Sequence, residues 1–393
     1  MRAGEEEGRA EEARCFIPCT LGLEGVVARE VRDLGASGVE AGRGGVHFMA
    51  TRRVAYAANL WLRAGIRVQH LIAHARLRGP DDLYRWILRM DWSRYMTPGM
   101  TIAVDASVSG SEHLRHSKYA AYRVKDAICD HWREKVGRRP SVNPKQPDLP
   151  LKLVIKGNEA TLYRNLSGTS LHKRGWRPIQ VKAPLNEALA AGLVLLSDWD
   201  RKSPLLDPMC GSGTIVIEAA MIAADRAPGL GRRFAFERWP DFDRELWSEL
   251  RREARRRGRP SLPFRIEGAD RHGGAVSLAR RGAMAADVRE LVRFSTAPLD
   301  RFRPDRTPST VVTNPPYGRR IGREEDLNAS WRDLGLFLRE HCRGAHAWVL
   351  CGDRTLTRHL GLKASVKHPV MNGPIECRFI RYDISAAGDS DES

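Results

Sequence analysis

The sequence lacks long apolar runs and paired cysteines. No apolar stretch of its 393 residues approaches the roughly 20 residues that a membrane-spanning helix needs. Its seven cysteines are scattered and form no CxxC pair, so we expect a reduced, cytoplasmic chain with free thiols. The segment HCRGAH, at positions 341–346, holds two histidines beside Cys342. Nothing nearby completes a metal site, so no metal is expected.

Both ends of the sequence are acidic and poor in apolar residues. The first residues, MRAGEEEGRAEEA, lack the basic and then apolar order of a secretory signal peptide. The last residues, AAGDSDES, are small and acidic. We expect segments 1–13 and 386–393 to be disordered, solvated tails.

Basic residues outnumber acidic ones by 65 to 48, which gives a formal net charge of +17. This excess favours a polyanionic partner, and nucleic acid before a membrane surface. Arginine-rich compositions also arise from genome bias, so charge alone leaves the partner open. Hydrophobic residues make up 42% of the chain, enough for the two or three globular domains that this length predicts.

The sequence pattern changes near residue 177. Before it, short strand-like segments such as ARCFIPCT and GGVHFMA alternate with helical ones, the longest being SKYAAYRVKDAICDHWREKVG. A hairpin is expected around Gly157-Asn158. This half is predicted to be an α+β region with a basic surface.

After residue 177, units of strand, loop and helix repeat, which predicts a doubly wound parallel sheet. A terminal hairpin around Asn372-Gly373 is expected to add an antiparallel edge. Ligands of such sheets bind at the carboxyl ends of the strands. The loops that follow the strands are therefore the places to look for a site.

The first informative loop is DPMCGSGT, residues 207–214. Asp207 ends an apolar strand, and a sharp turn leads into a helix that starts near Thr214. Gly211 and Gly213 allow close approach of the backbone to a ligand, and the helix N-terminus offers free N–H groups to an anion. The loop is neither a P-loop nor a GxGxxG fingerprint, because the required residues are missing. Alone, it is weak evidence, since it could be a plain βα turn.

A second acidic residue, Asp270, ends the next strand in IEGADRHGG. Such a residue can accept hydrogen bonds from both hydroxyls of a ribose, although it could instead cap the following helix. Together with Asp207 and the two glycines it suits a nucleoside with a zwitterionic amino-acid tail. S-adenosylmethionine is such a molecule.

The second informative loop is TNPPYG, which follows the apolar strand STVV. Pro315 and Pro316 fix φ near −65°, and the proline after Asn314 holds that residue extended. The Asn314 side-chain carbonyl and the Pro315 main-chain carbonyl could then accept both hydrogens of one planar –NH2 group, while Tyr317 stacks on the attached ring. Asn-Pro and Pro-Pro are also common turn signals, but the position after a buried strand favours a site for methylation of an amino nitrogen.

These two motifs resemble those of class I S-adenosylmethionine-dependent methyltransferases that act on amino groups. The segments FIPCTLGLEGVVAREVRDLGA, TSLHKRGWR, APLNEALAAGLVL and NGPIECRFIRYD are similar, more specifically, to the THUMP-domain RNA guanine-N2 methyltransferases. This family includes bacterial enzymes that methylate large-subunit ribosomal RNA and relatives that act on tRNA. The resemblance covers roughly residues 14–383.

The resemblance implies three domains. A ferredoxin-like portion is expected over residues 14–60, an RNA-binding THUMP domain over 61–176, and a Rossmann-like methyltransferase domain over 177–385. The last would hold a seven-stranded, mostly parallel α/β sheet with an antiparallel terminal hairpin.

The resemblance also implies roles for particular residues. Residues 183–187 would cover the methionine end of S-adenosylmethionine. The catalytic residues would be Asn314, Pro315, Pro316 and Tyr317. The cofactor-binding residues would be Asp207, Pro208, Cys210, Gly211, Gly213, Thr214 and Asp270. One departure from the family is that Pro298 stands where many relatives carry the acid that meets the adenine, with Asp300 two positions later.

Several basic clusters could contact RNA phosphates. They lie in HLRHSKYAAYRVK, in HKRGWR and in YGRRIGR beside the proposed target pocket. For the arginines between positions 251 and 259, a solvated helix face is at least as plausible. The expected RNA-binding residues are Lys118, Arg123, Lys125, Lys173, Arg174, Arg177, Arg319 and Arg320.

The sequence therefore favours an enzyme that methylates guanine N2 in structured RNA, with 23S ribosomal RNA ahead of tRNA. Methylation of adenine N6 or of a protein glutamine is an alternative, because NPPY serves these reactions too. An RNA-binding assembly factor without catalysis is the alternative outside enzymes. The complete set of motif residues argues against it.

Overall fold

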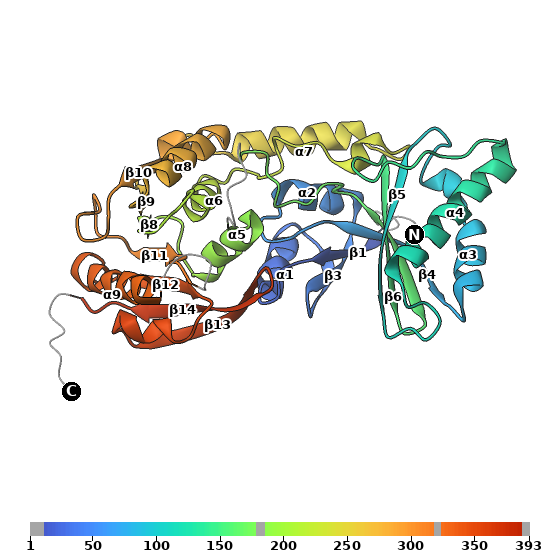
Figure 1. The fold of residues 1–393 in the computed structure, drawn as a ribbon. Helices are drawn as coiled ribbons and strands as arrows, with labels where there is room; N and C mark the ends of the chain where they lie inside the picture. Colours follow the sequence, from blue (N-terminus) through green and yellow to red (C-terminus); the bar gives the residue numbers. More distant parts are fainter. Residues whose placement is uncertain (1–11, 178–184, 318–323, 387–393) are drawn as a thin grey trace, which may run out of the picture. The chain divides into compact units, whose positions relative to one another are not determined.

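The computed structural model describes residues 12–177, 185–317 and 324–386 (Figure 1). The chain divides into two compact units. The first unit is drawn from Met1–Pro18, Ala28–Leu171 and Arg232–Arg252. The second is drawn from Cys19–Val27, His172–Gly231 and Glu253–Ser393. Each unit therefore includes a segment from the other half of the sequence.

The first unit contains a seven-stranded mixed sheet in the order β2-β3-β1-β4-β7-β6-β5. Its neighbours pair antiparallel except for β5 and β6, which are parallel. The strands are β1 (Ala13–Pro18), β2 (Ser37–Gly42), β3 (Gly45–Ala50), β4 (Gln69–Arg76), β5 (Ile102–Ser109), β6 (Leu149–Lys156) and β7 (Glu159–Asn165). The expected hairpin joins β6 and β7. Edge strand β2 has little apolar character, and the sequence pattern did not predict it.

The helices of this half follow the apolar periodicity of the sequence. They are α1 (Glu24–Asp33), α2 (Arg52–Trp61), α3 (Pro80–Leu88) and α4 (Ser117–Val136), with the short helix η1 (Trp92–Arg94). In α4 the buried side chains Val124, Ala127, Ile128 and Trp132 recur every three or four residues. Gly137 then ends the helix with a left-handed φ of 69°.

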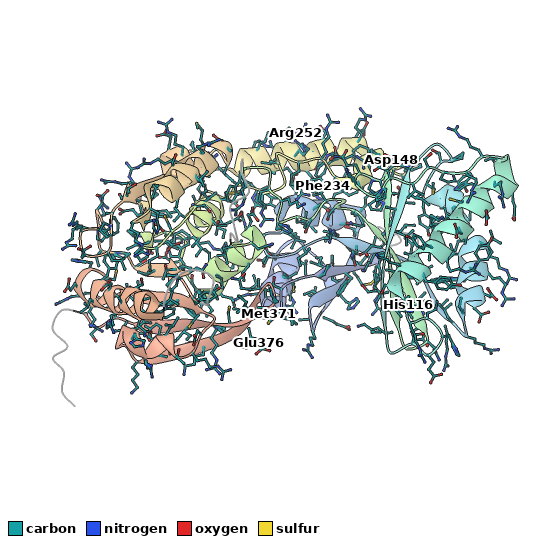
Figure 2. The ribbon with its side chains drawn as sticks, viewed as in Figure 1. His116, Asp148, Phe234, Arg252, Met371 and Glu376 are labelled. Atoms are coloured by element: carbon teal, nitrogen blue, oxygen red, sulfur yellow. The ribbon has the colours of Figure 1, made fainter. Side chains whose placement is uncertain are left out.

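The segment Arg232–Arg252 packs within the first unit through aromatic side chains. It contains η2 (Ala235–Arg238) and most of α7 (Arg244–Arg257). The Phe236 ring stacks on Tyr56 at 4.2 Å between centroids, and the Trp247 ring meets both edge-on. The guanidinium of Arg164 pairs with Asp241 at 2.9 Å. Figure 2 labels Phe234, whose ring stacks on Phe236 in the same cluster.

The second unit contains a seven-stranded sheet in the order β10-β9-β8-β11-β12-β14-β13. Strands β8 to β12 run parallel, and β14 pairs antiparallel with both β12 and β13. The strands are β8 (Leu205–Asp207), β9 (Ile266–Asp270), β10 (Val292–Thr296), β11 (Thr310–Thr313), β12 (His346–Cys351), β13 (Ala364–Asn372) and β14 (Ile375–Asp383). The expected mostly parallel sheet with an antiparallel hairpin is confirmed.

Helices connect and cover these strands. They are α5 (Glu187–Leu196), α6 (Thr214–Ala223), α8 (Gly273–Ala285) and α9 (Glu324–His341), with the short helices η3 (Arg289–Leu291) and η4 (Leu356–Leu360). Helix α6 packs against β8, β9 and α5, and α8 packs against β9 and β10. Since α6 and α8 directly follow β8 and β9, their N-termini lie at the carboxyl ends of those strands.

A segment from the N-terminal half, Cys19–Val27, completes the second unit. The Met371 N–H of the terminal hairpin donates to the Leu21 carbonyl at 3.1 Å. Gly22 has φ of +95°, and a Cβ there would lie 2.2 Å from the Pro369 carbonyl oxygen. Only glycine fits this close approach. Figure 2 labels Met371 and Glu376 on the hairpin.

Across the described residues, no helix is long and apolar enough to cross a lipid bilayer. In the same part of the chain, no group of three or more His, Cys, Asp or Glu side chains is arranged to hold a metal ion.

Candidate active site

The two loops singled out in the sequence follow neighbouring strands of the second sheet. Residues 208–213 follow β8, and residues 314–317 follow β11. Strand β8 lies between β9 and β11, and the order of the chain reverses between β8 and β11. In open parallel sheets, ligands bind at the carboxyl ends of the strands at such a reversal. The fold therefore brings both loops to its ligand-binding edge.

Main-chain hydrogen bonds hold the glycine loop against β9. The Cys210 N–H donates to the Ala269 carbonyl at 2.8 Å, and the Gly211 N–H donates to Oδ2 of Asp270 at 2.9 Å. The Cys210 thiol is buried, and burial raises its pKa well above the ordinary value. A neutral thiol is a poor nucleophile, so Cys210 is not poised for covalent chemistry.

The two glycines of the loop differ in their surroundings. Both have left-handed φ, +53° at Gly211 and +76° at Gly213. A Cβ at Gly211 would meet nothing within 4 Å, so the loop is open there. A Cβ at Gly213 would lie 2.7 Å from the Ala279 side chain and 2.9 Å from the Phe294 ring. Gly213 is therefore required for packing inside the unit, whereas Gly211 leaves room for a ligand.

Asp270 joins the loops after β8 and β9. Besides Gly211, its carboxylate accepts a hydrogen bond from the His272 N–H at 2.8 Å. The side chain is only partly buried, and each carboxylate oxygen has a second lone pair for a ligand hydroxyl. Asp300, the acid two positions after Pro298, lies in the loop after β10. Its side chain is 74% exposed, unlike that of Asp270.

Asp207 lies beneath the loop. It is 2% exposed, and its Oδ1 accepts hydrogen bonds from the Thr313 hydroxyl at 2.7 Å and the Met209 N–H at 3.2 Å. Burial raises its pKa from 3.8 to about 7, although the Thr313 hydrogen bond opposes the rise. These contacts make Asp207 a positioning residue for the loop. Thr313 was not among the predicted site residues, although a hydroxyl in a buried strand signals a polar partner.

Arg177 supports the start of helix α6. Its guanidinium donates to Glu187 at 2.8 Å and to the Thr214 hydroxyl at 3.1 Å. It also donates to the Leu185 carbonyl. The Arg177 and Glu187 side chains are only 14% and 9% exposed. The Arg177 charge is thus used inside the unit, and its contact with RNA stays a prediction.

Asn314 is an unsatisfied group at the NPPY turn. Its Oδ1 is buried and has no hydrogen-bond partner among the described residues. The turn itself is held in place, because the Trp331 indole N–H donates to the Pro316 carbonyl at 2.9 Å. Buried polar atoms are rarely left without partners. The turn thus presents an acceptor that a bound donor group could satisfy.

Tyr317 is anchored against the end of the sheet. Its hydroxyl accepts a hydrogen bond from the Asn372 amide at 2.7 Å, and burial raises the pKa of the phenol. A Cβ on Gly352 would lie 2.6 Å from the Tyr317 ring, so the ring packs closely against that glycine. The side chain is 9% exposed. Stacking on a target base stays a prediction.

The other expected RNA-binding residues fall into four groups. Lys118 and Lys173 are exposed, whereas Arg123 and Lys125 are partly buried and pair with Asp81 and Asp126. Arg174 is buried and pairs with Glu218 at 3.3 Å, so its charge, like that of Arg177, is used inside the unit, and its RNA contact stays a prediction. Arg319 and Arg320, like residues 183 and 184, lie outside the described residues.

Three family models match consecutive parts of the chain. The model described as an RlmL ferredoxin-like domain matches residues 14–69. The THUMP domain model matches residues 78–165, and the model of the RMKL-like methyltransferase domain matches residues 174–381, just over half of the chain.

Two relatives show how far the similarity extends. A Synechocystis protein, slr0064, named as a candidate RNA methyltransferase, is 35% identical over 94% of this chain and 96% of its own length. The "Ribosomal RNA large subunit methyltransferase K/L" of Syntrophotalea carbinolica is 41% identical over 94% of this chain but only 53% of its own length. The chain thus spans about half the length of the K/L relatives that it matches.

Two solved structures share the whole fold. One is SMU.472, a candidate methyltransferase complexed with S-adenosylhomocysteine (SAH), with 27% identity and a TM-score of 0.87 over 95% of this chain and 99% of the other. The second, from Listeria monocytogenes, is described as a predicted N6-adenine-specific DNA methylase. It has 29% identity and a TM-score of 0.86 over 95% and 97% of the two chains.

The resemblance noted in the sequence is confirmed by these matches. The domain models match in the expected order, and one relative aligns over nearly its full length. The chain belongs to the RMKL-like methyltransferase family and carries ferredoxin-like and THUMP domains ahead of its methyltransferase domain.

Proposed function

We propose that this chain transfers a methyl group from S-adenosylmethionine to the exocyclic N2 amino group of a guanosine in large-subunit ribosomal RNA. The observation that carries the proposal is the buried Oδ1 of Asn314, which has no partner among the described residues. It follows β11, next to the strand that bears the glycine loop. An amino group has two hydrogens to donate, and the Pro315 carbonyl is the second acceptor of this turn.

The residues after β8 and β9 fit S-adenosylmethionine. Among the described residues, no atom lies within 4 Å of a Cβ built at Gly211, which supports approach of the cofactor there, and Asp270 retains acceptor capacity for ribose hydroxyls. The related SMU.472 structure binds SAH, the demethylated form of this cofactor. When bound, S-adenosylmethionine supplies a methyl group on a positively charged sulfur.

The chain's own role is to position the amino nitrogen and to shift its electron density. Hydrogen bonds from the amino group to Asn314 and Pro315 favour a more pyramidal nitrogen, whose lone pair is free to attack the methyl carbon. The fixed turn, held by Trp331, keeps these acceptors from reorganising. Tyr317 would contact the face of the base, with its hydroxyl anchored by Asn372.

The choice of RNA rests on the THUMP domain and on relatives named for ribosomal RNA. The choice of guanine N2 rests on the sequence resemblance. Transfer RNA is a second substrate within that resemblance. Adenine N6 is the alternative target, favoured by the name of the Listeria relative. An RNA-binding assembly factor without catalysis would need no open acceptor at position 314.

The test uses Asn314→Ala in the full chain, with Asn314→Asp as the conservative variant that keeps an acceptor oxygen. Each protein is incubated with S-adenosylmethionine and deproteinised 23S ribosomal RNA or tRNA, and digested nucleosides are identified by mass spectrometry. We expect N2-methylguanosine from 23S RNA, a loss of roughly 10²-fold or more in kcat for Asn314→Ala, and a smaller loss for Asn314→Asp. Calorimetry should give unchanged cofactor affinity. Formation of methyladenosine instead would contradict the proposal that guanine is the target.

A further inference from the structure

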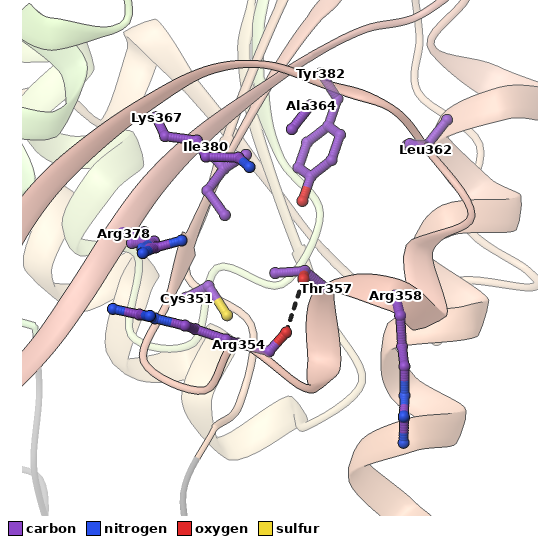
Figure 3. Close-up of a pocket in the computed structure, with 10 residues that line it drawn as sticks. All are labelled: Cys351, Arg354, Thr357, Arg358, Leu362, Ala364, Lys367, Arg378, Ile380 and Tyr382. Carbon is purple, nitrogen blue, oxygen red and sulfur yellow. Dashed lines mark hydrogen bonds between the residues drawn. The ribbon is translucent and has the colours of Figure 1, made fainter.

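A basic cavity opens at the carboxyl end of β12, between η4 and the terminal hairpin (Figure 3). Its volume is about 210 Å³. The lining residues that matter here are Cys351, Arg354, Arg358, Lys367, Arg378 and Tyr382. Four of these six carry positive charge, and none carries negative charge. The sequence pattern did not single out this cluster.

The cavity lacks acidic partners for its positive charges among the described residues. No carboxylate in that part of the chain forms an ion pair with Arg354, Arg358, Lys367 or Arg378. The nearest acid along the chain, Asp353, instead accepts hydrogen bonds from the Thr355 N–H and hydroxyl. Arg354 and Arg378 both line this cavity (Figure 3). Like charges that share a cavity repel one another, and a bound anion would relieve that repulsion.

The loop that carries Arg354 is held in a fixed conformation. The Thr357 hydroxyl donates to the Arg354 carbonyl at 2.8 Å, the contact drawn in Figure 3. Arg378 extends from β14, paired with Cys351 of β12 in the sheet. Two guanidinium groups on ordered backbone form a preorganised site for an oxyanion, because each can donate two parallel hydrogen bonds to phosphate.

The cavity and the proposed target site lie on opposite faces of β14, because Arg378 lines the cavity whereas the neighbouring Cys377 contacts the Tyr317 hydroxyl. They come together at the end of β12. Cys351 lines the cavity, and the next residue, Gly352, packs against the Tyr317 ring. A nucleotide whose base enters the NPPY site brings its flanking phosphates to the rim of that site. We propose that Arg354 and Arg378 bind a backbone phosphate of the RNA next to the methylated nucleotide. This inference rests on the proposed RNA substrate and names a contact that helps to present it.

The test compares Arg354→Gln/Arg378→Gln with Arg332→Gln/Arg343→Gln. The control pair removes the same charge from exposed arginines elsewhere in the second unit. Filter binding to deproteinised 23S RNA is measured from low to moderate salt. We expect the first variant to bind about tenfold or more weakly and to lower the slope of log K against log salt by roughly 1 to 2. The control should behave as the unmodified chain, and circular dichroism should show that both variants melt normally.

Other outcomes would overturn the inference. Equal losses in both variants would mean that only net charge matters. A different outcome is that inorganic phosphate raises the melting temperature of the unmodified chain but not that of Arg354→Gln/Arg378→Gln. If the salt slope for RNA binding is then the same in both proteins, the cavity is a site for free phosphate. If the unmodified chain methylates 23S RNA but the variant binds it normally, the cavity proposal fails while the proposed function stands. If the slope changes as expected but no N2-methylguanosine forms, the proposed function fails and the phosphate site stands.

Discussion

The Thr313 hydroxyl donates a 2.7 Å hydrogen bond to Oδ1 of Asp207, and both residues are buried. Thr313 immediately precedes Asn314, and Asp207 immediately precedes the glycine loop. One hydrogen bond therefore links the strand ends from which the two proposed ligand sites begin. Displacement of either strand end would disturb the spacing between a methyl donor and its acceptor.

Thr313→Val keeps the shape of the side chain and removes this donor. We expect it to lower the free energy of unfolding by about 1–3 kcal/mol, with the larger loss at pH 8, where Asp207 is ionised. Urea unfolding at pH 6 and pH 8 measures this. Thr310→Val, a buried residue of the same strand, is the matched control. Equal effects of the two variants would show that the hydroxyl bond contributes no specific stability.

Asp207 should make stability depend on pH. Its pKa is raised from 3.8 to about 7 by burial, so the folded chain binds a proton that the unfolded chain has already released. The stabilisation is present below about pH 4 and is lost as pH rises towards 7. The free energy of unfolding of the unmodified chain should therefore fall across that window relative to Asp207→Asn. Parallel pH curves for the two proteins would show that Asp207 is not protonated near neutrality.

Alanine substitutions at the two loop glycines should have different effects on stability and on cofactor binding. Gly213→Ala combines a left-handed φ with overlap against Ala279 and Phe294, so we expect a loss of about 2–5 kcal/mol in unfolding free energy. Gly211→Ala has the backbone strain alone, about 1–2 kcal/mol. Calorimetry should nevertheless show weaker S-adenosylmethionine binding by Gly211→Ala. Unchanged affinity in a folded Gly211→Ala protein would place the cofactor away from this residue.

Arg177 should prove structural, in contrast to its neighbour Lys173. Arg177→Met leaves the buried Glu187 carboxylate without its cation, and we expect a loss of about 3 kcal/mol or more. Lys173→Met alters an exposed side chain and should change stability by less than about 0.5 kcal/mol. Thermal unfolding compares the two. A stable Arg177→Met protein with weakened RNA binding would instead support the RNA role that the sequence suggested.

Local sequence signals were sufficient for the catalytic sheet. Apolar strands followed by glycine or proline turns indicated that Asp207, Asp270 and Asn314 end neighbouring strands, because strand order in a doubly wound sheet brings those ends to one edge. The terminal hairpin was equally clear from its Asn-Gly turn.

The sequence did not indicate which basic residues pair with acidic residues inside the fold. Arg174 and Arg177 looked like an RNA-binding patch, yet their partners, Glu218 and Glu187, lie 44 and 10 positions away. The cavity arginines, Arg354 and Arg378, come together only because β12 pairs with β14. Periodicity and composition carry no information about such long-range pairing.

The exchange of segments between the two units limits how this chain can be divided. A fragment that ends at Leu171 would lose Phe236 and Trp247, leaving Tyr56 without its ring partners. The complementary fragment would lose Leu21 and Gly22, against which the terminal hairpin packs. No single cut near residue 171 yields two complete cores. Transplanting the methyltransferase half onto another RNA-binding module would therefore require two grafts, one of them carrying Cys19–Val27.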